Sequence, residues 1–225
     1  MYRHELKYMI NEHSANILKS KIKAVCSYDK NADSTGGYRV TSLYFDDYCN
    51  SALNDNIDGN AVRKKFRIRV YDRSDALIRL ERKSKNNGGC KKDSVILSRE
   101  QYDGICCGDY SGLDIQRDPV LRDFYILATT KKLQPKVIVE YDREAFIYEF
   151  GTVRITIDQN VRYAVGEKDL FDQNAVYALA TGQNDRVLEV KYTGFLPNHI
   201  RTMIQGNAKN REAFSKYTMS RMGSY

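Results

Sequence analysis

Charged side chains alternate with apolar ones along several short segments of this chain. Arg67 and Arg69, for example, alternate with three apolar residues in segment 66–70. The same alternation recurs in segments 3–7, 78–83, 153–158 and 188–192. Because successive side chains of a β-strand face opposite sides of a sheet, each segment predicts a strand with one ionic face and one apolar face.

The ionic positions combine cations with carboxylates. Three Glu-x-Lys pairs stand out: Glu5-x-Lys7, Glu81-x-Lys83 and Glu189-x-Lys191. Arginine binds phosphoryl oxygens through forked hydrogen bonds, and lysine binds them as a compact charge. Carboxylates on the same face could hold Mg²⁺ or Mn²⁺, which bridges phosphate oxygens during phosphoryl transfer. The pattern therefore indicates phosphate chemistry assisted by a divalent metal ion.

An ordinary half-exposed sheet, with its charges in water, is the alternative interpretation of these segments. Solvated sheet faces usually carry Thr, Ser and Gln among the charges, whereas the polar positions here are almost all ionic. If the sheet closes on itself, the ionic faces converge inside and helices cover the apolar faces outside. Such an interior is costly unless its charges are paired or bind a ligand, and a densely charged anion would satisfy it.

The positive charge of the chain is concentrated in one segment. The net charge is +7, but residues 61–92 hold twelve Lys or Arg against three Asp or Glu, which is +9. A solvated basic face is one explanation, and a polyanionic partner such as nucleic acid, phosphorylated lipid or a phosphate chain is the other. Nucleic acid is disfavoured because the residues between the cations are aliphatic rather than stacking aromatics. No GxxxxGK[ST] phosphate loop is present.

The element pattern predicts an α+β, mainly antiparallel β fold in a single domain spanning residues 1–225. The expected strands are 2–10, 38–46, 65–71, 76–83, 94–98, 136–150, 152–158 and 187–192. Turns are expected at 86–89 and 149–152. Helices are expected after Asn11, after Ser98 with Gln101 as its capping-box partner, after Asp118, and after Leu196, with a further helical region at 211–222. About eight strands would form a closed β-tunnel with the helices packed outside.

Other sequence features indicate the cellular location of the protein. No apolar stretch approaches the roughly 20 residues of a membrane-spanning helix, and the first residues lack the apolar core of a signal peptide. We therefore expect a cytoplasmic protein. The five cysteines form no CxxC pair, which favours reduced thiols, and the three scattered histidines do not suggest a zinc site.

The motifs taken together resemble the catalytic domain of the vacuolar transporter chaperone (VTC) family, the polyphosphate polymerases, within the triphosphate tunnel metalloenzymes. The resemblance runs from about residue 3 to residue 216. It rests on Arg3-x-Glu5-x-Lys7-Tyr8, Ser42-Leu43-Tyr44-Phe45-Asp46, Arg67-x-Arg69, Leu80-Glu81-Arg82-Lys83, Tyr141-x-Arg143-x-Ala145-Phe146, Val153-Arg154-Ile155-Thr156-Ile157-Asp158 and Leu188-Glu189-Val190-Lys191. The chain resembles the short, stand-alone bacterial form.

The resemblance implies roles for individual residues. Cations that hold the nucleotide phosphates and the growing chain would be Lys7, Arg67, Arg69, Lys83, Arg143, Arg154 and Lys191. Further substrate contacts are expected from Arg3, Arg79, Tyr44, Lys91, Lys92 and Lys216. Glu189 would be the principal ligand of Mn²⁺ or Mg²⁺, with Glu5, Glu81 and Asp158 as further metal candidates. Arg143 and Asp158 could instead form a structural ion pair, and Lys91, Lys92 and Lys216 could be surface residues.

The implied activity is transfer of the γ-phosphoryl group of ATP to polyphosphate or orthophosphate. Many relatives in the superfamily begin with Glu-x-Glu-x-Lys, and Arg3 stands at the first acidic position here, which favours a polymerase over a tripolyphosphatase. A nucleoside triphosphatase or tripolyphosphatase of the same fold remains the nearest alternative, and a non-catalytic module that binds polyphosphate or inositol pyrophosphate is another. No nucleic-acid partner is expected, a membrane protein that accepts the chain is compatible with the resemblance, and the sequence sets no oligomeric state.

Overall fold

The computed structural model describes residues 3–34, 36–86, 89–208 and 215–223 of the chain. These residues form two compact units. Unit 1 comprises Met1–Arg39, Tyr141–Val161 and Thr181–Ser215. Unit 2 comprises Val40–Glu140, Arg162–Ala180 and Lys216–Tyr225.

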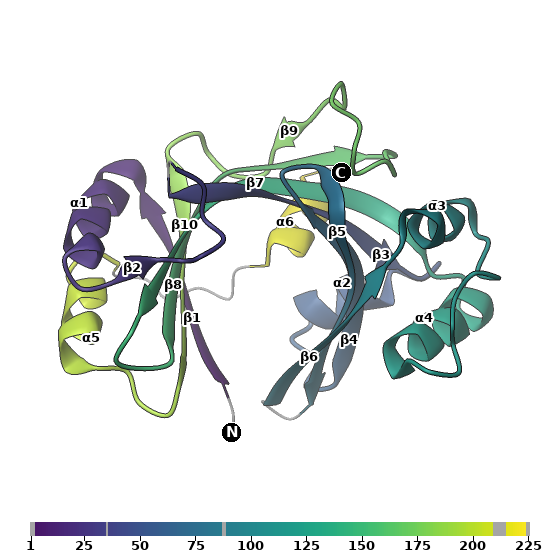
Figure 1. The fold of residues 1–225 in the computed structure, drawn as a ribbon, viewed down its shortest axis with the longest axis horizontal. Helices are drawn as coiled ribbons and strands as arrows, with labels where there is room; N and C mark the ends of the chain where they lie inside the picture. The colour runs from purple at the N-terminus through teal and green to yellow at the C-terminus, as the bar shows by residue number, and fades with distance from the viewer. Residues whose placement is uncertain (1–2, 35, 87–88, 209–214, 224–225) are drawn as a thin grey trace. The chain divides into compact units, whose positions relative to one another are not determined.

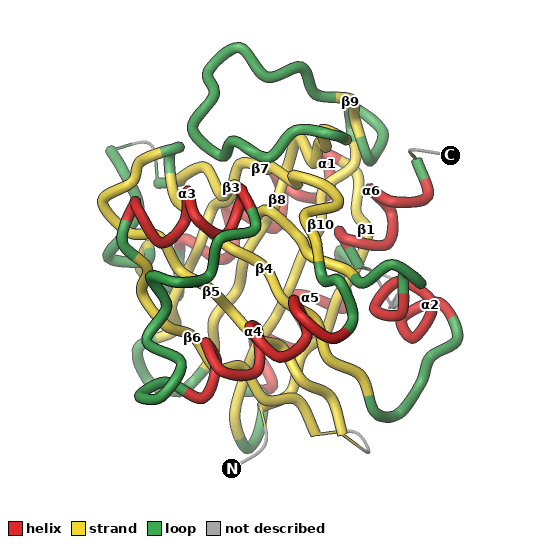
Figure 2. Tube along the Cα trace, turned by 90° about the vertical axis from the view of Figure 1, so that its right-hand side faces the viewer, coloured by secondary structure: helices red, strands yellow, loops and turns green. Residues whose placement is uncertain are grey.

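Strands dominate both units, as Figures 1 and 2 show. The strands pair in the order β1-β10-β8-β7-β3-β4-β5-β6, with β2 beside β7 and β9 beside β8. The elements in chain order are β1 Arg3–Asn11, α1 Glu12–Lys23, β2 Ser27–Tyr28, β3 Gly37–Asp46, α2 Ser51–Ile57, β4 Arg63–Tyr71, β5 Ser74–Asn86, β6 Gly89–Leu97, α3 Arg99–Cys107, α4 Pro119–Thr130, β7 Gln134–Tyr148, β8 Val153–Val165, β9 Ala178–Leu179, β10 Asp185–Thr193, α5 Asn198–Gln205 and α6 Lys216–Met222.

The predicted fold class is confirmed: the protein is an antiparallel β structure with helices, and all eight predicted strands are present. The sequence did not predict α2 or the two-residue strands β2 and β9. The pairing order ends on β1 and on β6. Closure of the sheet into a tunnel therefore stays a prediction, as does the single-domain boundary at 1–225.

In unit 1, helices α1 and α5 cover the apolar face of β1, β8 and β10 (Figure 1). The core between them contains Leu18 and Ile22 from α1, Ile200 from α5, and Ile155 and Val190 from the strands, each completely buried. These strand residues alternate with the ionic ones. The predicted division into an apolar face and an ionic face therefore holds in this unit.

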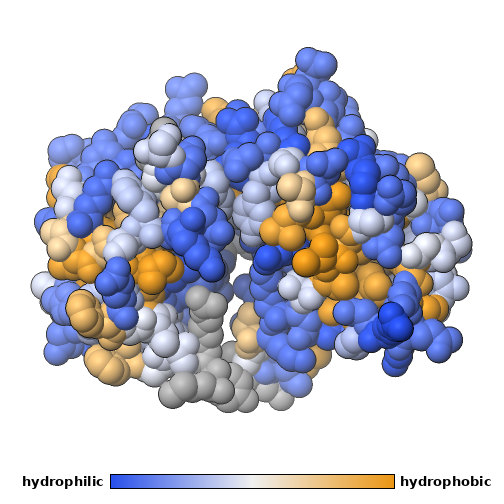
Figure 3. Space-filling model, in the orientation of Figure 1, coloured by the Kyte–Doolittle hydropathy of each residue, from blue (hydrophilic) through white to orange (hydrophobic). Residues whose placement is uncertain are grey.

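In unit 2, helices α3 and α4 cover the apolar face of β4 and β5. Ile68 and Leu80 from the strands pack with Tyr102 from α3 and with Leu121 and Phe124 from α4. Apolar side chains also reach the surface of this unit around α3 and α4 (Figure 3). Since the helices occupy the apolar face, the arginines that alternate with Ile68 lie on the other face of the sheet.

Helix starts follow the predicted caps. The Asn11 side chain accepts from the Ser14 N–H before α1, and Asp118 accepts from two N–H groups before α4. Ser98 and Gln101 form both halves of a capping box before α3. Helix α1 ends at Lys23, and Val25, which follows it, is 39% exposed. None of the helices described is long and apolar enough to cross a membrane.

The turn at 86–89 and the helical region at 211–222 are described in part. Asn86 pairs with Gly89 across β5 and β6, as a two-residue turn requires, and residues 87–88 lie outside the described residues. Residues 209–214 lie outside them too, and the C-terminal helix α6 is described from Lys216.

Candidate functional site

The ionic face of unit 1 is built from two cross-strand rows. The register of β1, β10 and β8 aligns each row, and antiparallel register brings opposite side chains within about 5 Å at Cβ. One row reads Lys7, Glu189, Thr156 and the other reads Glu5, Lys191, Arg154. Each lysine therefore has a carboxylate on the neighbouring strand.

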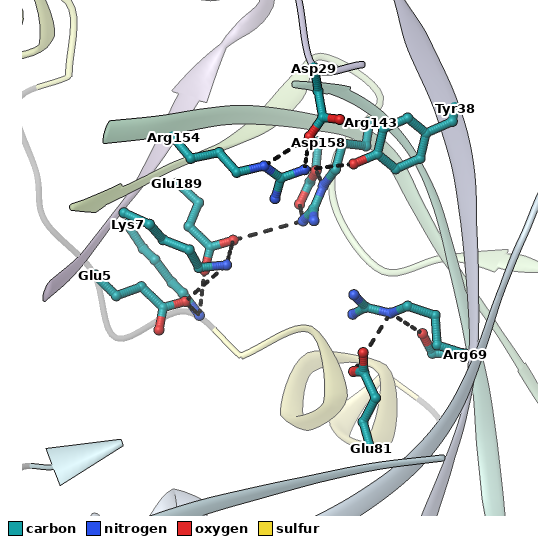
Figure 4. Close-up of polar contacts among 12 residues, drawn as sticks. Glu5, Lys7, Asp29, Tyr38, Arg69, Glu81, Arg143, Arg154, Asp158 and Glu189 are labelled. Carbon is teal, nitrogen blue, oxygen red and sulfur yellow. Dashed lines mark hydrogen bonds and ion pairs between the residues drawn. The ribbon is translucent and has the colours of Figure 1, made fainter. Parts of the chain in front are cut away.

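The two lysines bridge the two glutamates. Figure 4 shows Lys7 with Glu5 and Glu189. The Lys7 ammonium lies 3.3 Å from Glu5 Oε1 and 3.7 Å from Glu189 Oε1. The Lys191 ammonium lies 3.0 Å from Glu189 Oε2 and 3.9 Å from Glu5 Oε1. The structure thus brings together four residues that the sequence predicted for the site.

Arg143 and Asp158 form a bidentate ion pair beside this group. Arg143 donates from Nε and Nη2 to the two oxygens of Asp158, at 2.6 and 2.8 Å, and both residues are buried. Burial lowers the pKa of Arg143, but the facing Asp158 carboxylate outweighs it and raises the pKa well above the usual range. Arg143 Nη2 also lies 3.8 Å from Glu189 Oε2, so the pair adjoins the carboxylate predicted to bind metal.

Arg154 is oriented by two residues that the sequence did not single out. It donates to Asp29 Oδ2 from Nη2 and Nε, at 2.8 and 3.1 Å, and from Nη2 to the Tyr38 hydroxyl at 2.8 Å. Burial raises the pKa of Asp29, but the Asn31 N–H and the Arg154 guanidinium together hold it below its usual value. Among the described side chains, four cations face four carboxylates here: Lys7, Lys191, Arg143 and Arg154 against Glu5, Glu189, Asp29 and Asp158.

On the ionic face of unit 2, cross-strand register places like charges opposite one another. Register across β4, β5 and β6 aligns Lys65, Lys83 and Lys92 in one row, and aligns Arg69 with Arg79 in another. Between these rows, Arg67 is opposite Glu81. Like charges on opposite residues destabilise a sheet. Within these rows of described residues, six cations accompany one carboxylate, Glu81.

Glu81 is the anionic centre of this group and is 1% exposed. Its Oε2 lies 2.7 Å from Arg67 Nε and 3.9 Å from Arg69 Nε, and its Oε1 lies 2.5 Å from the Lys92 ammonium. Burial raises the pKa of Glu81, but the three cations outweigh it and hold the pKa well below the usual range. Both oxygens are therefore engaged by cations of the protein. Figure 4 shows Arg69 beside Glu81.

Tyr44 on β3 contacts Arg67 of this group. Its hydroxyl accepts from Arg67 Nη1 at 2.8 Å, and its ring stacks on Tyr217 of α6 at 5.1 Å. Burial raises the pKa of Tyr44, but Arg67, Lys65 and Arg69 outweigh it and lower the pKa to about 7. Lys65, which lies 6.0 Å from the Tyr44 ring, was not among the predicted site residues although it has the same strand parity as Arg67. Alternation along β4 was the signal that could have found it.

The remaining predicted residues are placed as follows. Lys91 is separated from Lys92: its side chain is 75% exposed and pairs with Asp93 at 3.1 Å, on the face of β6 opposite to Lys92. Lys216 is the first residue of α6, next to Tyr217. The side chain of Arg3 lies outside the described residues.

The residues of unit 1 fit a divalent metal ion of the type that phosphate enzymes use. Among the described residues no group of three or more His, Cys, Asp or Glu converges to hold a metal. Mg²⁺, however, is usually bound by one or two carboxylates, with phosphates and water completing its shell. Glu5 and Glu189 match that requirement, because the Lys7 ammonium already occupies a position close to both carboxylates. Asp158 and Glu81 fit less well, since arginine or lysine groups engage both of their oxygens.

Comparison with known protein families shows which family this chain belongs to. A family model described as the VTC domain matches residues 2–224. The chain belongs to the VTC domain family. The resemblance drawn from the strand motifs is thereby confirmed, and the VTC domain covers nearly the whole sequence. Membership places the chain among the triphosphate tunnel enzymes.

Solved structures with the same fold are distant in sequence. A Bacillus halodurans protein provisionally named an adenylate cyclase has a TM-score of 0.53 at 15% identity, over 92% of this chain and 89% of that one. Protein PH1819 of Pyrococcus horikoshii has a TM-score of 0.50 at 12% identity, over 99% and 100% of the two chains. A Vibrio parahaemolyticus protein, also provisionally named an adenylate cyclase, has a TM-score of 0.50 at 9% identity, over 97% of each chain. No curated protein matches this VTC domain.

Proposed function

We propose that this VTC domain is a metal-dependent polyphosphate polymerase that transfers the γ-phosphoryl group of ATP to polyphosphate or orthophosphate. The observation that carries the proposal is the pair of like-charged rows on the ionic face of unit 2. The row Lys65, Lys83, Lys92 and the pair Arg69, Arg79 place like charges opposite one another. Such rows are unfavourable without an anion. A polyphosphate chain carries a negative charge on each phosphate and could therefore neutralise successive cations along the rows.

The arginines of unit 2 would position the phosphates. The guanidinium group presents a planar fork of donors that matches phosphoryl oxygens, so Arg67 and Arg69 are suited to fix their direction. Glu81 Oε2 accepts from Arg67 Nε at 2.7 Å and lies 3.9 Å from Arg69 Nε. Arg69 Nε donates to Ser42 Oγ at 3.4 Å. Because these contacts already orient the two arginine side chains in the free protein, phosphate binding has to restrict them less and costs less entropy.

The carboxylates of unit 1 would hold Mn²⁺ or Mg²⁺. Glu189 and Glu5 are the expected ligands, and the ion would offset the charge that develops on phosphate oxygens during transfer. Lys7 and Lys191 neutralise these carboxylates in the metal-free protein. When a cation takes over that role, the two ammonium groups become available to phosphoryl oxygens.

Phosphoryl transfer of this kind requires positioning and charge stabilisation rather than a protein nucleophile. The cations of the ionic face of unit 2 would supply stabilisation for the equatorial oxygens of the transferred group. The acceptor phosphate is itself the nucleophile, so no side chain needs to form a covalent intermediate.

Incubation of the purified protein with ATP and Mn²⁺, followed by gel electrophoresis of the products, tests the proposal. Polyphosphate chains with stoichiometric ADP are expected from the wild type. Arg67→Gln should lose most of this activity, whereas Arg99→Gln, which removes an exposed guanidinium paired with Asp103 on α3, should keep it. Free phosphate without chains would identify a triphosphatase instead. Tight binding of polyphosphate with no turnover would identify a binding module.

A further inference from the structure

Thr156 on β8 buries a hydroxyl group that has no hydrogen-bond partner among the described residues. The residue is 1% exposed and is directly opposite Glu189 in the β8–β10 pair. Strand alternation places it on the ionic face of unit 1, between Arg154 and Asp158. Burial of an unpaired hydroxyl is costly, and such groups in native proteins often mark a ligand or water contact.

A second buried threonine shows the usual arrangement. Thr41 in unit 2 is completely buried, and its hydroxyl donates to Glu140 Oε2 at 2.9 Å. The corresponding acceptor for Thr156 by register is Glu189. The Glu189 carboxylate is instead engaged by Lys191 and Lys7, at 3.0 and 3.7 Å. Valine has nearly the same shape as threonine, so packing alone does not require a hydroxyl at this position.

We propose that Thr156 Oγ1 is a further oxygen donor to the divalent cation that Glu5 and Glu189 would hold, either directly or through one water molecule. This inference rests on the proposed function. Mg²⁺ and Mn²⁺ prefer oxygen ligands, and a Ser or Thr hydroxyl holds Mg²⁺ in P-loop enzymes. The hydroxyl would add an oxygen ligand without adding charge to the site. Hydrogen bonding between the adjacent strands β1, β10 and β8 fixes the spacing of the three residues.

Mn²⁺ binding to the full chain, measured by the loss of the free-ion electron paramagnetic resonance signal, tests the assignment without reference to turnover. Thr156→Val should weaken Mn²⁺ binding roughly tenfold or more, the effect of losing a supporting group at a metal site. Thr156→Ser keeps the hydroxyl and should restore most of the affinity. Thr181→Val is the matched control, because Thr181 also buries an unpartnered hydroxyl in unit 1 outside the two cross-strand rows.

Thermal unfolding in EDTA provides a second readout. Because valine removes an unpaired buried hydroxyl, Thr156→Val should raise the melting temperature of the metal-free protein by about 3 °C. Equal Mn²⁺ affinity of Thr156→Val and wild type would overturn the inference while leaving the proposed function intact. Failure of the wild type to bind Mn²⁺ would overturn both the inference and the metal assignment. Chain synthesis from ATP would still report on the polymerase proposal separately.

Discussion

Lys7 on β1 and Glu189 on β10 are opposite residues in the antiparallel pair, and the Lys7 ammonium lies 3.7 Å from Glu189 Oε1. Glu5 Oε1 lies 3.3 Å from the same ammonium. A divalent cation that binds these carboxylates must therefore compete with Lys7. By linkage, cation binding and the release of lysine toward phosphate should strengthen each other.

Replacement of Lys7 should separate these two effects. Lys7→Met removes the competing charge, so Mn²⁺ should bind about fivefold more tightly, as expected for a partly exposed charge near both carboxylates. Metal-free tripolyphosphate should bind more weakly, because a cation has been lost. Titration calorimetry with each ligand measures both. Lys19→Met is the control, since Lys19 pairs with Glu144 outside the two rows and is similarly exposed. Weaker Mn²⁺ binding by Lys7→Met would contradict the competition.

Loss of the Glu81 carboxylate should destabilise the free protein. Glu81→Gln leaves Arg67, Arg69 and Lys92 without their shared counter-ion, and we expect a loss of about 2 kcal/mol, below the range for a fully buried pair because Lys92 is half exposed. Tripolyphosphate should restore more stability to this variant than to the wild type, because the anion replaces the missing charge. Urea unfolding with and without tripolyphosphate measures the difference. Exposed Glu167→Gln should show neither effect.

The low pKa of Glu81 sets the pH range of its contribution. Its carboxyl is held below the usual range in the folded protein, so the stabilisation is fully present above the unfolded pKa and is lost as the pH falls through the folded value. The destabilisation caused by Glu81→Gln should therefore shrink only in acid. A difference that disappears already at neutral pH would show that the cations do not hold the carboxylate ionised.

Strand alternation is a local property, which is why the two faces could be predicted from sequence. Arg67 and Arg69 alternate with Phe66 and Ile68, and the apolar pair packs against α4 as expected. Helix caps are local as well, so Asn11 was predicted correctly. The seven-residue helix α2 was missed because its Asn50 cap makes no side-chain hydrogen bond and its apolar residues are few.

Contacts between distant segments could not be predicted in the same way. Asp29 binds Arg154 across 125 positions of sequence, and nothing around Asp29 marks it as the partner. The lysine row of unit 2 depends on the register of β4, β5 and β6, which alternation does not specify. Lys91 and Lys92 were both predicted as substrate contacts, but adjacent strand residues must face opposite sides, and Lys92 alone contacts Glu81.

The Arg143–Asp158 pair allows a test of whether Asp158 stabilises the fold or binds the metal ion. Asp158→Asn leaves a buried guanidinium without its bidentate acceptor, so the protein should lose about 3 kcal/mol of stability. Mn²⁺ affinity should stay within about twofold of wild type, because both Asp158 oxygens already bind Arg143. Chemical unfolding and Mn²⁺ titration of the same sample check the two outcomes. If Mn²⁺ binding falls as far as in Glu189→Gln, Asp158 is a ligand.

Tyr44 should give phosphate binding a pH dependence near neutrality. Its pKa is lowered to about 7 by Arg67, Lys65 and Arg69, so above that pH the phenolate adds a negative charge to the ionic face of unit 2. Metal-free tripolyphosphate should therefore bind more weakly in the wild type as the pH rises from 6 to 8. The Tyr44→Phe variant has no phenol to ionise, so its tripolyphosphate affinity should lack this decrease between pH 6 and pH 8. Calorimetric titrations at several pH values, with exposed Tyr48→Phe as control, measure it.

The same ionisation affects stability with a definite sign. The folded pKa of Tyr44 is depressed below its ordinary value of about 10, so phenolate formation stabilises the folded protein above pH 10 and that stabilisation is lost as the pH falls through about 7. Wild type should gain on the order of a few kcal/mol relative to Tyr44→Phe between pH 7 and pH 10. Parallel stability curves for the two proteins over that range would mean that Tyr44 remains a neutral phenol, and its hydroxyl would then add no negative charge beside the cations at any pH tested.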